Sequence, residues 1–362
     1  MKVMHLVPAM EQGGVETVVC DLNRVVVGSG WENVVVSKGG RLVGRIEADG
    51  GRHVKLDVRS KNPLTYFLRA WKLRRVLKAE QPDLVCVHSR VPAWLFVWAN
   101  RRLGLKWITY AHGANSVSRY SAVMTKGDLT ITPSKFLAGY LMQNYGLDEN
   151  RIRVINPAVD AARFDPAKLD AAFVESKRRA WGLAPDDFVV MAVGRVTQVK
   201  GYDTLIRAVA KLAPRLPQVK LVIVGDADRR HRDYLASLKR LAAEVGIGRL
   251  TVFAGGESRI PECLSLASVV VSANTRKPES FGLSMAEALM MNKPVVAKAF
   301  GGALDIVRHG EDGLLVRDDD FAAAIERVRG MAFGDLRQAI LRRFNGRVLA
   351  GRTMAVYREV LV

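Results

Sequence analysis

The feature that most constrains the fold of this chain is a regular alternation of short apolar runs with longer amphipathic segments. The runs expected to be strands are Lys2–Val7, Asn33–Ser37, His53–Val58, Leu84–His88, Lys106–Ala111 and Leu129–Thr132. Helices are expected after Glu16, ending at about Val27, and at Leu64–Ala79, Pro92–Leu103 and Ser134–Tyr145. Parallel strands need crossover connections of this length. The alternation therefore predicts an α/β protein with a helix-covered parallel sheet.

The same alternation begins again after a connector, Ile155–Pro166, that contains prolines and turn-forming residues. Its strands are expected at Phe188–Val193, Val219–Val224, Leu250–Phe253, Ser268–Val271 and Val295–Ala297. These runs are apolar throughout, as expected when both faces of a sheet are covered. Because 362 residues exceed the usual size of one core, we expect two doubly wound domains, residues 1–157 and 158–346. Two final helices, about Phe333–Asn345 and Gly351–Leu361, should follow the last strand.

Charge and cysteine content limit the partners and the compartment. The net charge of +19 indicates an anionic partner, which could be nucleic acid, an anionic membrane or a phosphorylated substrate. Nucleic acid is disfavoured because no zinc-finger spacing, aromatic RNA-binding motif or basic tail is present. Three widely spaced cysteines suggest a reducing compartment. The N-terminus does not resemble a signal peptide, so we expect a cytoplasmic protein.

The stretch from Glu279 to Glu287 carries two carboxylates joined by Ser280-Phe281-Gly282. A helix beginning near Gly282 would direct unpaired N–H groups at whatever lies in front of it, which suits a phosphate. Glu279 would lie on the loop before the helix, and Glu287 just over one turn inside it. Such an arrangement fits a ligand with a phosphate centre and hydroxyl-rich ends. An ordinary helix N-terminus with a solvated glutamate is an alternative of similar weight.

A second motif is the basic loop Gly194-Arg-Val-Thr-Gln-Val-Lys-Gly201, which follows a predicted strand and precedes a predicted helix. Ligands of open α/β sheets bind at the carboxyl ends of strands. Arg195 and Lys200 at such a position suit a diphosphate, the arginine through its fork and the lysine as a point charge. The alternative is a solvated basic loop. The sequence lacks the Walker pattern.

Two further candidates lie in the first half. Gly13 and Gly14 directly follow the first predicted strand, where glycine lets the backbone approach a phosphate or sugar. The three spaced glycines of a dinucleotide site are absent, so a tight turn is an equal alternative and a nicotinamide cofactor is disfavoured. His112, in Tyr110-Ala-His-Gly-Ala114, follows another predicted strand and could donate to a substrate oxygen. A buried histidine with a structural hydrogen bond is the alternative.

Taken in order along the chain, these motifs and Gly301-Gly302 resemble the retaining GT-B glycosyltransferases of family four. The similarity extends over nearly the whole chain and is greatest to bacterial transferases of the lipopolysaccharide-core and mannosyltransferase type. The resemblance implies two facing Rossmann-like domains with a central cleft, and a nucleotide sugar held mostly by the second domain. It also implies that a C-terminal helix, residues 347–362, packs back on the first domain.

The resemblance further implies roles for individual residues. The donor diphosphate would be bound by Arg195 and Lys200, the ribose by Glu287 and the donor sugar by Glu279. The backbone of Phe281, Gly282, Leu283 and Ser284 would lie near the sugar hydroxyls and the phosphate. Gly13 and Gly14 would face the diphosphate, and His112 would lie against the transferred sugar. The loop Ala254–Arg259 would meet the nucleobase. The donor would be of the UDP or GDP type, with no separate cofactor.

Breaking a sugar–diphosphate bond builds negative charge on the departing phosphate, which Arg195, Lys200 and helix N–H groups could stabilise. With two such cations no metal is needed. The acidic runs Asp226–Asp228 and Asp318–Asp320 could suggest a metal, but we favour loop and helix-start roles for them. Glu279 could serve as a nucleophile in a double displacement. Because the resemblance makes Glu279 a ligand of the sugar hydroxyls instead, we favour same-face transfer with retention, in which the departing phosphate helps to deprotonate the acceptor.

The acceptor is expected to be a cell-envelope glycan or glycolipid, such as the lipopolysaccharide core. The segment Leu64–Lys78 mixes apolar and basic positions at helical spacing, which suits contact with an anionic membrane at the cytoplasmic face of the inner membrane. A core-facing helix with solvated basic residues is as plausible. Two other functions remain open: a sugar-nucleotide epimerase on the same scaffold, and a non-catalytic sugar-nucleotide binder.

Overall fold

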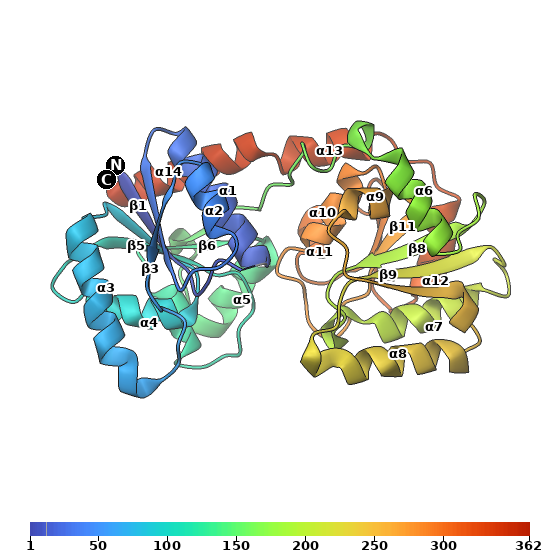
Figure 1. Ribbon diagram of the computed structural model, residues 1–362, viewed down its shortest axis with the longest axis horizontal. Helices are drawn as coiled ribbons and strands as arrows, with labels where there is room; N and C mark the ends of the chain where they lie inside the picture. Colours follow the sequence, from blue (N-terminus) through green and yellow to red (C-terminus); the bar gives the residue numbers. More distant parts are fainter. Residues whose placement is uncertain (12) are drawn as a thin grey trace. The chain divides into compact units, whose positions relative to one another are not determined.

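A computed structural model describes residues 1–11 and 13–362 of the chain, which divides into two compact units. The first unit comprises Met1–Ala158 with Gly346–Val362, and the second comprises Val159–Asn345. Figure 1 shows that each unit is a sheet covered by helices on both faces. Each unit is an α/β sandwich of the Rossmann-like kind, as the alternation in the sequence predicted.

The first unit is built on a seven-stranded parallel sheet in the order β3-β2-β1-β4-β5-β6-β7. Its strands are β1 (Lys2–Leu6), β2 (Glu32–Ser37), β3 (Arg52–Lys55), β4 (Leu84–Val87), β5 (Lys106–Tyr110), β6 (Leu129–Thr132) and β7 (Ile152–Val154). Its helices are α1 (Gly14–Gly28), α2 (Val43–Ala48), α3 (Tyr66–Glu80), α4 (Arg90–Ala99), α5 (Lys135–Tyr145) and α14 (Gly346–Leu361). The central strands are buried on both faces, which explains their continuous apolar sequence.

The second unit is built on a six-stranded parallel sheet in the order β10-β9-β8-β11-β12-β13. Its strands are β8 (Phe188–Val193), β9 (Val219–Val224), β10 (Thr251–Gly255), β11 (Val269–Ser272), β12 (Val295–Lys298) and β13 (Gly313–Val316). Its helices are α6 (Ala171–Ala180), α7 (Tyr202–Leu212), α8 (Arg232–Glu244), α9 (Ile260–Ser265), α10 (Leu283–Met290), α11 (Ala303–Ile306), α12 (Phe321–Arg329) and α13 (Leu336–Arg343). Two apolar clusters cover the two faces of this sheet.

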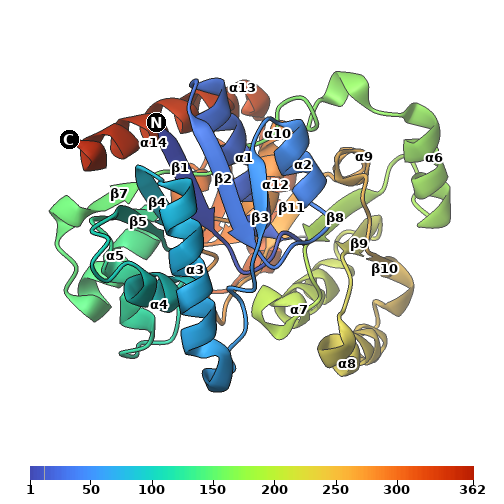
Figure 2. The ribbon, with the colours of Figure 1, turned by 60° about the vertical axis from the view of Figure 1, so that its left-hand side comes forward.

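The last helix, α14, belongs to the first unit although it follows α13 of the second. Tyr357 on α14 is fully buried, and its hydroxyl lies 2.8 Å from that of Tyr110 at the end of β5. Leu349, Met354 and Val360 join the same apolar cluster. Figures 1 and 2 both show the two ends of the chain close together on this unit. The apolar face of α14 therefore completes the core of the first unit.

Several elements differ from the sequence-based expectation. The run His53–Val58 was expected to be a strand, but β3 ends at Lys55; it lies at the edge of the sheet, where only one neighbour can pair with it. Helix α4 begins at Arg90 because Pro92 is tolerated in a first helical turn. Six α-helices or strands were not expected: α2, β7, α6, α11, β13 and α12. Helix α6 buries none of its residues, so its sequence carries little apolar pattern.

Candidate functional site

The strand order places most of the candidate residues at one position in each sheet. In the first unit β1 lies between β2 and β4, and in the second β8 lies between β9 and β11. Ligands of open parallel sheets bind outside the carboxyl ends of the strands at such a switch point. Gly13 and Gly14 follow β1, the loop Gly194–Gly201 follows β8, and Glu279 follows β11. His112 follows β5, one strand further along the first sheet.

In the second unit, the loop after β8 is held in place by the start of α7. The hydroxyl of Tyr202 donates a hydrogen bond to the carbonyl of Gly194 at 2.8 Å. Burial and the nearby carboxylate of Glu279 raise the pKa of Tyr202, so the hydroxyl stays protonated. This contact closes the loop around Lys200, which is half-buried. Arg195 is exposed and forms no hydrogen bond or ion pair with the described residues.

Lys200 and Glu279 form an ion pair, although 79 positions separate them in the sequence. The side-chain amide of Asn274 donates to the same carboxylate oxygen at 3.0 Å. Asn274 is itself hydrogen-bonded to Ser272 at the end of β11, at 3.3 Å. The carboxylate of Glu279 is therefore held between a cation and an amide, and its position is set by two strand ends.

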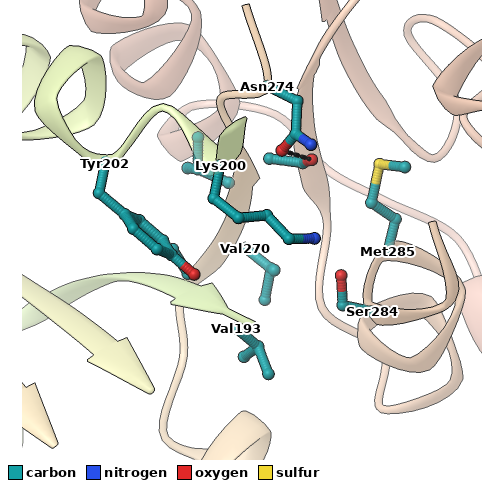
Figure 3. A pocket seen from close by; sticks show the side chains of 10 residues that line it. Val193, Lys200, Tyr202, Val270, Asn274, Ser284 and Met285 are labelled. Carbon is teal, nitrogen blue, oxygen red and sulfur yellow. Dashed lines mark hydrogen bonds between the residues drawn. The ribbon is translucent and has the colours of Figure 1, made fainter. Parts of the chain in front are cut away.

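Figure 3 shows the Lys200 amine directed toward the space between Asn274 and Ser284, with Tyr202 on one side. Ser284 belongs to the first turn of α10. The cavity that these side chains enclose measures about 10 Å³, which is no larger than a single water needs. A ligand would therefore contact the rim of this cavity. The rim carries the Lys200 amine, the Ser284 hydroxyl and the Asn274 amide.

Helix α10 begins at a glycine with a left-handed backbone. Gly282 has φ of 103° and precedes the first residue of α10. Because glycine has no side chain that could accept a hydrogen bond there, the first N–H groups of α10 can donate to an anion. The helix dipole also favours negative charge at this end. Leu283 and Ser284 supply the first N–H groups, as the sequence predicted.

The Gly301-Gly302 pair supports the loop that carries Glu279. The N–H of Gly302 donates to the carbonyl of Glu279 at 2.8 Å. A side chain at Gly302 would overlap the carbonyl oxygen of Phe281, and one at Gly301 would overlap Pro278. Glycine is therefore required at these positions by close packing against the loop. Phe281 itself is buried and packs edge-on against Phe344.

Glu287 lies on α10 and, within the described part of the chain, forms no hydrogen bond or ion pair with Lys200. Burial raises the pKa of its carboxyl to about 7, and the guanidinium of Arg163 acts in the opposite direction. Arg163 donates to the carbonyl of Ser258 at 3.0 Å, which places it beside the loop Ala254–Arg259. Glu287, Arg163 and this loop thus form a second end of the site, distinct from the Lys200 end.

Arg259 is fixed by several contacts at this second end. It donates to Asp170 at 3.0 Å and to Glu262 at 2.9 Å, and its guanidinium lies 4.2 Å from the ring of Phe173. Arg163, Ser258 and Arg259 line a pocket of about 200 Å³. Arg163, Arg259 and backbone carbonyl groups in this pocket can bind a planar, polar ligand.

In the first unit, Gly13 caps the start of α1 with an extended backbone, φ 173°. A side chain at Gly13 would crowd Glu16, whereas a side chain at Gly14 would meet open space. His112 is half-buried, and its Nε2 lies 2.8 Å from Nδ1 of His88. His112 therefore has both features that the sequence left open: a structural hydrogen bond and a partly accessible ring.

The two acidic runs occupy loops and helix starts. Asp226 accepts from the N–H of Gly256, Asp228 pairs with His231, and Asp320 caps α12 by accepting from the N–H of Ala323. Among residues 1–11 and 13–362, no group of three or more His, Cys, Asp or Glu is placed to hold a metal ion.

Sequence reasoning missed three residues that the structure places next to candidate residues of their own unit: Asn274 and Arg163 in the second unit and His88 in the first. Asn274 lies between a predicted strand and Glu279, so its place after a strand end was a usable signal. Arg163 lies in the interdomain connector and His88 at the end of a predicted strand. Nothing in their local sequence shows which side chains they meet.

Two family models match successive parts of the chain. Residues 173–332 match the family described as glycosyl transferases group 1, and residues 12–163 match glycosyltransferase family 4. A relative from Nocardioides sp. (strain ATCC BAA-499 / JS614), D-inositol 3-phosphate glycosyltransferase, is 32% identical over 257 residues, which is 66% of this chain and 55% of the relative. The chain thus spans about half the length of the curated relatives it matches.

Solved structures share the fold over nearly the whole chain. A glycosyltransferase from Rickettsia africae ESF-5 has a TM-score of 0.89 at 26% identity, covering 99% of this chain and 98% of that one. Anabaena Alr3699/HepE in complex with UDP has a TM-score of 0.83 at 21% identity, covering 99% and 100%. The lipopolysaccharide outer core galactosyltransferase WaaB, in its apo form, has a TM-score of 0.77 at 18% identity, covering 99% and 100%.

Proposed function

Because the chain belongs to the GT-B glycosyltransferases of group 1 and family 4, we propose that it transfers a hexose-type sugar with retention. The donor is a nucleotide diphosphate sugar of the UDP type, and the acceptor is a hydroxyl of a cell-envelope glycan or glycolipid. The observation that carries this proposal is the cluster of Lys200, Glu279 and Asn274 beside the uncapped start of α10. The UDP complex of the Anabaena protein supports the choice of base.

In this reaction the bond between the anomeric carbon and the diphosphate oxygen breaks, and a bond to the acceptor oxygen forms on the same face. The acceptor proton passes to the departing phosphate. Lys200, Arg195 and the N–H groups of α10 stabilise the negative charge that develops on that phosphate, without a metal. Such fixed donors need little reorganisation during the reaction.

The carboxylates have separate roles in this proposal. Glu279, held by Lys200 and Asn274, accepts hydrogen bonds from the hydroxyls of the donor sugar. Glu287 accepts from the ribose hydroxyls, and the loop around Arg259 meets the nucleobase. An ion-paired Glu279 is a poor nucleophile, which supports direct same-face transfer over a double displacement.

Donor binding is tested by thermal denaturation with UDP-glucose and with GDP-mannose. We expect UDP-glucose to raise the Tm of the wild-type protein, because a ligand that binds the folded state stabilises it by mass action. Lys200→Ala should abolish this increase. Lys211→Ala, an exposed lysine on α7, is the matched control and should retain it. If both nucleotide sugars leave the Tm unchanged, the donor class is wrong.

Reaction type is tested by NMR of the products. A retained anomeric configuration in the glycosylated product supports the proposal, and an inverted one overturns it. Conversion of the nucleotide sugar to its epimer without any acceptor would instead identify an isomerase. Binding of UDP-glucose without turnover on envelope glycolipid extracts would identify a binding protein.

The surface of α3 supports a membrane-associated acceptor. Leu64, Phe67, Leu68 and Trp71, here called the α3 patch, are 91%, 62%, 52% and 48% exposed. The guanidinium of Arg75 lies 4.9 Å from the ring of Trp71, and further lysines are exposed on the same helix. Among the described residues, no helix is long and apolar enough to cross a membrane. An apolar patch bordered by cations suits peripheral contact with anionic lipid.

We propose that the α3 patch binds the cytoplasmic face of the inner membrane. We expect binding to vesicles that contain phosphatidylglycerol, weaker binding in high salt, and little binding to phosphatidylcholine alone. Changing Phe67 and Leu68 to serine should weaken binding by about tenfold or more, because apolar burial is lost. Leu304→Ser removes an equally exposed side chain of the second unit and should leave vesicle binding unchanged. Equal binding of all three proteins would contradict the assignment.

A further inference from the structure

Three histidines in the first unit form a continuous chain of hydrogen-bonded rings. His5 lies on β1, His88 follows β4 and His112 follows β5, and these three strands are neighbours in the sheet. Nδ1 of His5 lies 2.8 Å from Nε2 of His88, and Nδ1 of His88 lies 2.8 Å from Nε2 of His112. His5 is 0% and His88 3% exposed, whereas His112 is half-buried.

The surroundings keep all three rings neutral. Burial lowers the pKa of His5 to about 3 and that of His112 to about 4, and the pKa of His88 lies well below its ordinary value. The ring of Tyr110 stacks on His88 with centroids 4.6 Å apart and fixes its plane. A neutral imidazole has one N–H donor and one acceptor nitrogen.

Neutral rings in series can donate in only two ways. In the outward direction, Nδ1–H of His5 donates to His88, and Nδ1–H of His88 donates to Nε2 of His112. In the inward direction every donor and acceptor is exchanged. Because His88 has a single N–H, both hydrogen bonds must run the same way. The state of the terminal nitrogens therefore follows from the direction of the chain.

The inner end of the chain selects between these directions. Nε2 of His5 is buried and has no hydrogen-bond partner among residues 1–11 and 13–362. The inward direction would place an N–H at this atom, and the outward direction a lone pair. Buried N–H groups without an acceptor are rarer in proteins than unpaired acceptors, and a stranded donor is costly. The outward direction is favoured.

We propose that His5 and His88 are positioning residues that hold His112 as the tautomer protonated on Nδ1. His112 then presents a neutral N–H donor at the carboxyl end of β5 to an oxygen of the bound substrate, and Nδ1 has no lone pair with which to accept a proton. His112 is thereby a hydrogen-bond donor and not a general base. The identity of that substrate rests on the proposed glycosyl transfer, but the tautomer does not.

The tautomer is measured in the free protein by NMR with nitrogen-15-labelled histidine, since protonated and unprotonated ring nitrogens give well-separated signals. The sequence has six histidines, and the signals of His112 are identified by their loss in His112→Ala. We expect Nδ1 of His112 to be protonated and Nε2 to be unprotonated. A protonated Nε2, or a mixture of tautomers, would overturn the proposal whether or not the protein is active.

Two variants of His5 separate a positioning role from a packing role. His5→Asn keeps an N–H near the position of Nδ1 and should preserve the tautomer of His112. His5→Leu removes the hydrogen bond to Nε2 of His88, so the His88 ring is no longer held in place and its hydrogen bond to His112 should weaken. With UDP-glucose as donor, we expect kcat/KM to fall about tenfold in His5→Leu, the size of one hydrogen bond, and to stay near wild type in His5→Asn. Equal activity losses in both variants would mean that only packing was disturbed.

The activity assay and the tautomer measurement fail independently. If no nucleotide sugar is turned over but Nδ1 of His112 is protonated, the proposed function fails and the tautomer assignment stands. If transfer occurs and Nε2 is protonated, the assignment fails alone. Should His5→Leu not fold, the spectrum of the wild-type protein still decides the direction of the chain.

Discussion

Glu287 is a residue whose surroundings disfavour its charged form. Its carboxyl group lies half-buried on α10 and has no hydrogen bond or ion pair within the described part of the chain. Burial raises its pKa from 4.5 to about 7. An ionised carboxyl with so little solvation destabilises the folded protein. Such groups are common at binding sites, where a ligand supplies the missing hydrogen bonds. The proposed ribose hydroxyls would be such partners.

The pH dependence of stability follows from this shift. Between pH 4.5 and about 7 the folded protein retains a proton that the unfolded chain releases. Below pH 4.5 Glu287 is protonated in both states and does not affect the free energy of unfolding. As the pH rises from 4.5 to about 7, Glu287 lowers the free energy of unfolding, and above pH 7 this loss is complete. Glu287→Gln removes this loss and should raise the free energy of unfolding at pH 8 by about 3 kcal/mol, and by much less at pH 5. Urea denaturation at the two pH values measures both.

A matched control is Glu244→Gln, which changes an exposed glutamate at the end of α8. Its stability should differ little from wild type at either pH. Glu287→Gln should also weaken UDP-glucose binding, because an amide is a poorer acceptor for two hydroxyls than a carboxylate. Stabilisation at pH 8 together with unchanged nucleotide affinity would leave Glu287 as a structural residue.

At the scale of elements, the site depends on two loops that approach each other from different strands. The loop after β8 supplies Lys200, and the loop after β11 supplies Glu279; their ion pair links the two. Gly302, at the start of α11, supports the second loop through the carbonyl of Glu279. The geometry of the site is thus set by packing between loops and helix starts.

Gly302→Ala tests this support. The added methyl group would overlap the carbonyl of Phe281 and push the loop away from α11. Overpacking of this kind should cost about 1–3 kcal/mol of stability, and displacement of Glu279 should weaken UDP-glucose binding. Denaturation and calorimetric titration measure the two effects. Gly334→Ala is the control, since a side chain there meets open space. Unchanged binding in Gly302→Ala would show that the loop does not depend on this contact.

At the scale of the whole molecule, the chain leaves the first unit once and returns to it with α14. The buried hydroxyl pair of Tyr110 and Tyr357, and an ion pair between Arg153 and Glu359, attach the returning helix to the first sheet. The first unit is therefore incomplete without α14. Its stability should depend on the buried residues of this helix.

Tyr357→Ala measures this dependence. Loss of a fully buried aromatic side chain should cost about 3–5 kcal/mol, whereas Tyr357→Phe, which removes only the hydroxyl, should cost about 1 kcal/mol. Hydrogen exchange should show faster opening of β5 and β6 in Tyr357→Ala, with β8 and β9 of the second unit unchanged. Equal acceleration in both sheets would mean that the two units unfold together.

Much of the architecture was accessible from local sequence. The α/β class and the GT-B family were predicted from the alternation of apolar runs and from the motifs, and both are confirmed. The strands Leu129–Thr132, Phe188–Val193 and Val219–Val224 have the expected bounds. These features are local, because a run of buried apolar residues specifies a central strand wherever it is placed. The roles assigned to the site residues remain predictions.

The sequence by itself determined which residues follow strand ends, and therefore that Lys200, Glu279 and His112 lie beyond the carboxyl ends of their strands. Only the tertiary structure decided their partners: Glu279 with Lys200, Arg163 beside Glu287, and His88 between His5 and His112. The physical reason is that side-chain partners depend on which strands are neighbours and in what register. That order is set by packing over the whole unit, and no local pattern encodes it.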